Sequence, residues 1–112
     1  MSVPAEILAT GFSLPESYVR ACELGLGHLA PWRFLGGEAF LTAYARLNAG
    51  DADEILLPFA RRSDCDEIAC FEVLPGPPEQ VRVLQRKGDA YTPLAEFPSF
   101  WIWFRQGVED TI

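Results

Sequence analysis

The sequence predicts one α+β domain, residues 1–112, in which an antiparallel sheet of three to four strands carries helices packed on one face. Three observations favour this fold class. Within residues 54–83, three short apolar runs are separated by turn residues, which is typical of an antiparallel meander. Apolar residues recur at helical spacing both before and after that stretch. A length of 112 residues also suits a single domain with its own core.

The first helices are predicted in the N-terminal quarter of the chain. Residues 1–10 have weak helical character. A second helix is expected to start at Ser13, the N-cap, because Glu16 follows three residues later as in a capping box. Gly25 and Gly27 stop this helix, and we expect one of them in the left-handed C-cap conformation. Its predicted apolar stripe consists of Leu14, Tyr18, Ala21 or Cys22, and Leu24.

A loop and another helix are expected next. Residues 28–37 form the predicted loop, and residues 38–48 form the predicted helix, which an Asn-Ala-Gly sequence ends. The apolar residues of the loop are Leu29, Trp32, Phe34 and Leu35. The apolar residues at helical spacing are Phe40, Leu41, Tyr44 and Leu47.

Three strands are predicted at residues 55–60, 68–73 and 81–83. Pro58 lacks a backbone donor, so the first of these strands should lie at a sheet edge or carry a bulge at that position. Residues 91–94 are expected to form either a short final strand or an extended crossing segment.

A final helix is predicted from the spacing of aromatic residues. The residues that would share its apolar face are Phe97, Phe100, Trp101, Phe104 and Val108. The aromatic residues expected in the core are Phe71, Phe100, Trp101 and Phe104. Ile102 would lie opposite the apolar face and Trp103 at its flank, and an exposed isoleucine beside a tryptophan points to a partner surface.

Composition and cysteine usage predict a cytoplasmic protein. No apolar run approaches the roughly 20 residues that span a bilayer. The N-terminus lacks a basic segment followed by a long apolar one, so no signal peptide is expected. Three cysteines, without the spacing of a metal site, fit a reducing compartment better than a disulfide framework.

The net charge of -7 is distributed unevenly. Residues 1–50 hold four acids and three bases, whereas residues 51–112 hold twelve acids and six bases. An acidic surface repels nucleic acid and anionic membrane, so neither is an expected partner. It would attract a basic protein, and the alternative explanation is that the charge serves solubility alone.

No catalytic signature is present, and we expect no enzymatic activity. The alternative is a small hydrolase in which Cys65, in a turn, pairs with His28, because a nucleophilic thiolate needs a neighbouring base. Cys22 and Cys70 are better explained as small core residues.

No metal or cofactor is expected either. Acidic residues gather at positions 51–54 and 64–67, but neither cluster has the loop length or the glycine of a calcium-binding hand. One histidine and the absence of a C-x-x-C pair do not support a tetrahedral zinc site. Both clusters are better explained as solvated turn carboxylates.

The remaining candidate site is a protein-binding surface. Acidic turns flank the first two strands, and Glu72 is expected to link them along an exposed sheet face, where they would steer a basic partner. Trp32 and Phe34 are either partner contacts or caps on the core. The candidate partner-binding residues are Asp51, Asp53, Asp64, Asp66, Glu67, Glu72, Trp32, Phe34 and Trp103.

Over residues 11–108 the chain resembles the SUKH superfamily, which joins fungal cell-wall-synthesis regulators to bacterial toxin-immunity proteins. The pieces that carry this resemblance are Leu57-Pro58-Phe59-Ala60, with the strand that follows, and Phe97-x-x-Phe100-Trp101. The resemblance implies an α+β fold and binding without catalysis, namely neutralisation of a cognate bacterial toxin. With the acidic charge, the expected partner is a basic toxin domain such as a nuclease. A regulatory or scaffold module is the alternative.

Overall fold

The computed structural model describes residues 3–29, 32–49, 55–62, 64–74, 80–88 and 90–110. Within them the chain forms an α+β fold, and its antiparallel sheet has more strands than the three to four expected. The helices are α1 (Ala5–Leu8), α2 (Glu16–Glu23), α3 (Gly37–Leu47) and α4 (Phe100–Asp110). The strands are β1 (His28–Leu29), β2 (Trp32–Phe34), β3 (Ile55–Arg62), β4 (Glu67–Leu74), β5 (Val81–Lys87) and β6 (Ala90–Phe97).

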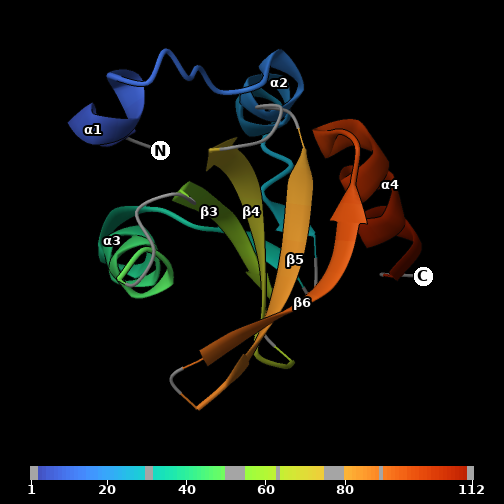
Figure 1. Cartoon of the computed structure of the whole chain (residues 1–112). Coiled ribbons are helices and arrows are strands. Elements are labelled where there is room, and N and C mark those ends of the chain that lie inside the picture. The colour runs from blue at the N-terminus through green and yellow to red at the C-terminus, as the bar shows by residue number, and fades with distance from the viewer. Residues whose placement is uncertain are drawn as a thin grey trace.

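The sheet follows chain order from β1 to β6, with each strand antiparallel to the next. The expected meander of β3, β4 and β5 is therefore confirmed, and β6 is a full eight-residue strand. In Figure 1, α1 and α2 lie at one end of the strands, and the β5–β6 hairpin extends beyond the rest of the sheet at the other end. The pairing of β3 with β4 shifts between Pro58 and Ala60, which confirms the bulge that the proline predicted.

The two shortest strands lie where a loop was expected. Their pairing partners explain why local sequence did not indicate them, because β2 pairs with residues almost 30 positions later. Trp32 lies opposite Arg62, and Phe34 lies opposite Ala60. Leu35 N–H then donates to the carbonyl oxygen of Phe59 at 2.8 Å. The sheet therefore holds this segment through contacts that form only when the chain folds.

α2 ends as predicted but starts later than predicted. The N-cap is Pro15 rather than Ser13, and no side chain caps the first turn. At its other end, Gly25 adopts a φ of 72°. The N–H of Gly25 donates to the carbonyl of Cys22, and the N–H of Leu26 donates to that of Ala21, as in a Schellman motif. Tyr18 and Ala21 are buried, whereas Cys22 and Leu24 are exposed, so those two were wrongly expected in the core.

Helices cover both faces of the sheet, in contrast to the single covered face that was expected. Alternation along β4 separates Phe71, which faces α2 and α4, from Ile68 and Cys70 on the opposite face. Ala43 and Leu47 of α3 pack against that second face. Figure 1 shows α3 and α4 on opposite sides of the strands. This arrangement makes a space between α3 and the sheet in which a site can form.

The main core lies between the first face of the sheet and α1, α2 and α4, and it also includes Phe40 of α3. Phe59 and Phe71 stack with their ring centroids 4.3 Å apart, and Tyr18 meets both rings edge-on. Its aromatic members are Phe12, Tyr18, Trp32, Phe40, Phe59, Phe71, Phe100, Trp103 and Phe104. Such a dense aromatic cluster fixes α2 and α4 relative to the sheet.

The register of α4 differs from the expected one, because Trp103 rather than Trp101 faces the core. Phe100 and Phe104 are buried as predicted, but Trp101 is 47% exposed and Trp103 only 2% exposed. Phe100, Trp103 and Phe104 are spaced by three and four, which is also a helical stripe. Aromatic residues at four of five successive positions allow either stripe, and the contact of Trp103 with Phe59 at 4.8 Å selects this one.

α3 matches the helix predicted at residues 38–48 closely, and Asn48 joins its end to the sheet. Of the predicted stripe, Phe40 is buried and Tyr44 and Leu47 are partly buried, whereas Leu41 is exposed.

Within the described residues, no helix is long and apolar enough to cross a membrane.

Candidate functional site

A groove runs between α3 and the second face of the sheet, and we call it the α3 groove. It consists of two adjoining pockets, which share Leu35, Ala39, Arg61 and Asp66. The more enclosed pocket has a volume of about 240 Å³. Its lining residues are Leu35, Glu38, Ala39, Thr42, Ala43, Arg46, Arg61, Asp66, Glu67, Ile68, Arg86 and Tyr91. The second pocket adds Arg33, Phe34, Gly36, Arg62, Asp64 and Cys65.

The strand register places the sheet side of the groove. Arg61 of β3 pairs with Ile68 of β4, and Ile68 pairs with Leu84 of β5. Arg86 lies two residues beyond Leu84, on the same face of β5, and pairs with Tyr91 of β6. The strands β3, β4, β5 and β6 therefore contribute to one surface of the sheet, which α3 covers.

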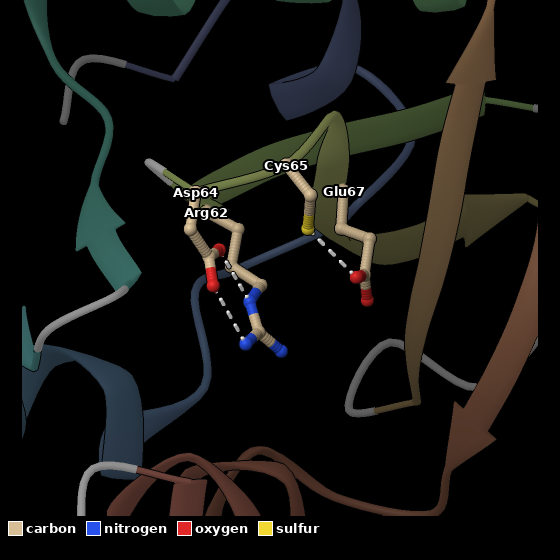
Figure 2. A network of polar contacts seen from close by, with 4 residues as sticks. All are labelled: Arg62, Asp64, Cys65 and Glu67. Atoms are coloured by element: carbon tan, nitrogen blue, oxygen red, sulfur yellow. Dashed lines mark hydrogen bonds and ion pairs between the residues drawn. The ribbon is translucent and has the colours of Figure 1, made fainter.

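The turn between β3 and β4 closes one end of the groove. Figure 2 shows the guanidinium of Arg62 against the carboxylate of Asp64, with Nε to Oδ1 at 2.7 Å. The hydrogen bond and charge of Arg62 lower the pKa of Asp64. Both groups are partly or fully exposed, so this pair fixes the shape of the turn more than it stabilises the fold.

Beside this ion pair, the Cys65 thiol donates to Glu67 Oε2 at 2.9 Å (Figure 2). Burial and this hydrogen bond raise the pKa of the Cys65 thiol to about 11. At neutral pH the sulfur is therefore a neutral thiol. That protonation state is the opposite of what a nucleophilic cysteine needs.

The α3 groove has a charge balance unlike that of the whole chain. Among the residues that the structure describes, five arginines and four acids line it. The whole chain, by comparison, carries nine basic residues and sixteen acids. The basic residues of the groove are Arg33, Arg46, Arg61, Arg62 and Arg86. Arginine is enriched in protein interfaces because its planar fork bonds carboxylates and stacks on apolar groups.

The structure brings together four of the residues expected to bind a partner. Asp64, Asp66, Glu67 and Phe34 all line the α3 groove. Asp51 and Asp53 lie outside the described residues.

The other three expected residues are buried. Trp32 and Trp103 pack edge-on in the core with ring centroids 5.2 Å apart. Glu72 was expected on an exposed sheet face, but it is 4% exposed. Its Oε2 lies 3.2 Å from Nε of Arg82 on the neighbouring strand β5, and this pairing explains how a carboxylate can be buried there.

Sequence reasoning missed the arginines of the groove and its α3 side. The arginines are separated by up to 53 positions in sequence, so no spacing pattern connects them. A usable signal was the small residues Ala39, Thr42 and Ala43 on α3, which leave room between this helix and the sheet.

The described residues contain no group of three or more histidine, cysteine, aspartate or glutamate side chains that could hold a metal ion. Cys70 is fully buried in β4, where burial raises its pKa, and Cys22 is exposed on α2. The pairing of Cys65 with His28 is not tested, because the side chain of His28 lies outside what the structure describes.

Comparison with known proteins identifies no relative of this chain. No family model, curated protein or solved structure matches the chain.

Proposed function

We propose that this chain is a non-enzymatic, cytoplasmic protein-binding domain that neutralises a cognate bacterial toxin through the α3 groove. The observation that carries the proposal is the composition of the groove. It combines arginines, carboxylates and a partly apolar floor on one open surface, as protein interfaces do. The toxin-neutralising role rests on the resemblance to the SUKH superfamily.

The chemistry at the groove supports binding rather than catalysis. The only cysteine lining it is Cys65, whose raised pKa keeps the thiol protonated at neutral pH. The net charge of -7 gives the molecule a negative field that attracts a basic partner from a distance. The groove would then hold the partner through short-range contacts.

Rescue of bacterial growth tests this function. The chain is co-expressed with the toxin domain encoded beside its own gene, and we expect growth to be restored. Ala39 lines both pockets, so Ala39→Trp should fill the groove and abolish rescue. Ala45 is exposed on the same helix and does not line the groove, so Ala45→Trp should still rescue. Equal rescue by both variants, or none by the wild type, would contradict the proposal.

A further inference from the structure

Three arginines from three separate elements line the more enclosed pocket of the α3 groove. They are Arg46 of α3, Arg61 of β3 and Arg86 of β5. Among the described residues, none of these guanidiniums forms an ion pair with a carboxylate. The guanidinium of Arg86 donates from Nε to the backbone carbonyl of Gly88, at 2.9 Å. The three cations therefore share one pocket without a bound counter-charge from the described chain.

The acids of the same pocket do not fill that role. Glu67 accepts the thiol of Cys65, which holds its carboxylate at the β3–β4 turn. Asp66 and Glu38 are exposed and make no ion pair within the described part of the chain. The arginines thus keep their hydrogen-bonding capacity for a ligand from outside.

Three like charges around one small pocket repel one another, and an anion between them relieves that repulsion. The pocket floor includes Ala43 and Ile68, whose apolar surface excludes water and strengthens a charge-assisted hydrogen bond. Thr42 and Tyr91 also line the pocket and carry hydroxyl donors. The chemistry of the lining therefore suits an oxyanion.

The size of the pocket and the net charge of the chain restrict the class of ligand further. A volume of about 240 Å³ is below the roughly 300–1,000 Å³ of small-molecule sites, so it suits one side chain. The net charge of -7 repels a free anion as it approaches. A carboxylate that belongs to a basic protein avoids this repulsion.

We infer that the pocket formed by Arg46, Arg61 and Arg86 binds an aspartate or glutamate side chain presented by the partner protein. This inference rests on the proposed function and names the group that the groove recognises. The surrounding acids then discriminate against a partner that presents acids beyond the pocket, because like charges face each other there.

An NMR titration with glutarate, which carries the carboxylate of a glutamate side chain, tests the inference without the toxin. The Nε–Hε signals of Arg46, Arg61 and Arg86 should shift saturably at millimolar glutarate. Arg20 and Arg105 are exposed and lie outside the groove, so their signals should not saturate. Arg61→Gln should weaken binding about tenfold, as expected for the loss of one charged hydrogen bond. Arg105→Gln, the matched control, should leave binding unchanged.

The remaining outcomes separate this inference from the proposed function. Shifts that are absent, or equal at all arginines, would overturn the carboxylate pocket. Inorganic phosphate that binds more than tenfold tighter than glutarate would also overturn it and point to a phosphorylated partner. If glutarate does not bind while growth rescue still requires an open groove, only the further inference fails. If glutarate binds while rescue fails, the pocket stands and the toxin-neutralising function fails.

Discussion

The side-chain amide of Asn48 connects the end of α3 to the start of β3 through both its nitrogen and its oxygen. Its Nδ2 donates to the carbonyls of Tyr44 and Leu56, at 2.9 and 2.8 Å, and its Oδ1 accepts the Leu56 N–H at 2.9 Å. Leu56 is buried, so loss of these bonds would leave its backbone groups without partners among the described residues. One side chain thereby fixes the wall of the α3 groove against the sheet.

Asn48→Ala should therefore lower the free energy of unfolding by about 2–3 kcal/mol, the cost of leaving buried backbone groups unpaired. Asn48→Asp keeps an acceptor for the Leu56 N–H but loses both donated bonds, so we expect an intermediate loss. Urea denaturation of the three proteins measures these values. Wild-type stability in Asn48→Ala would show that the amide bridge does not hold α3 in place.

The Cys65 thiol gives a prediction about pH. Its pKa is raised from 9.0 to about 11 in the folded state, so the folded protein holds a proton that the unfolded chain releases between those values. The resulting contribution to stability is complete below pH 9 and is lost as the pH rises towards 11. Because the thiolate reacts with iodoacetamide, alkylation of Cys65 at pH 8 should be slower than that of an unfolded thiol.

Alkylation rates in a Cys22→Ser background check this prediction, because Cys22 is exposed and Cys70 is buried. Glu67→Gln removes the carboxylate that accepts the thiol, so it should speed the reaction at pH 8. Cys65 that reacts at pH 8 as fast as an unfolded thiol would mean that it is not held protonated.

At the scale of elements, α4 offers two tryptophans with opposite environments. Trp103 is buried against Trp32 and Phe59, whereas Trp101 leaves about half of its surface in water and contacts Phe100 and Phe104 at its edge. Trp103→Ala should cost about 3–5 kcal/mol of unfolding free energy, as for other buried aromatic residues. Trp101→Ala should cost about 1–1.5 kcal/mol. Denaturant midpoints that shift equally in the two variants would contradict this helix register.

The elements predicted correctly are those that local sequence determines. Helical spacing and glycine stops located α2 and α3, and apolar runs between turns located β3, β4 and β5. β1 and β2 were missed because both are short, and because the pairing of β2 with β3 is distant in sequence. The register of α4 was missed because its first five residues are almost all aromatic, so the choice between Trp101 and Trp103 depends on packing.

The candidate site was also predicted only in part, because most of its residues are distant in sequence and meet only in the folded chain. The acidic turn at Asp64, Asp66 and Glu67 is contiguous in sequence, and the structure places it in the groove. The arginines reach the groove from several different elements, and strand pairing together with the packing of α3 on the sheet brings them together. Burial of Glu72 also depends on a partner, Arg82, that lies on the next strand.

For the whole molecule, the net charge of -7 predicts electrostatic steering. The association rate with a basic toxin domain should fall as salt rises, because salt screens exposed charges. Glu23 and Glu109 lie outside the groove in the last turns of α2 and α4, where lysine suits the helix macrodipole. Reversing both to lysine changes the net charge from -7 to -3.

Stopped-flow measurements of this double variant should show a lower association rate, with the dissociation rate and the melting temperature close to wild type. The groove is unchanged in this variant, so the loss reports only on long-range charge. An association rate that responds neither to salt nor to the two reversals would contradict electrostatic steering. Binding would then depend on the groove contacts only.

Hydrogen–deuterium exchange of the chain, with and without the toxin domain of the proposed function, locates the interface and thereby tests whether the α3 groove binds the partner. The rival surface is the outer side of α4, where Trp101 and Ile102 are both about half exposed. Binding in the α3 groove predicts slower exchange in α3, residues 37–47, and in the turn at residues 64–67, with α4 unchanged. Slower exchange confined to α4, with α3 and the turn unaffected, would contradict it.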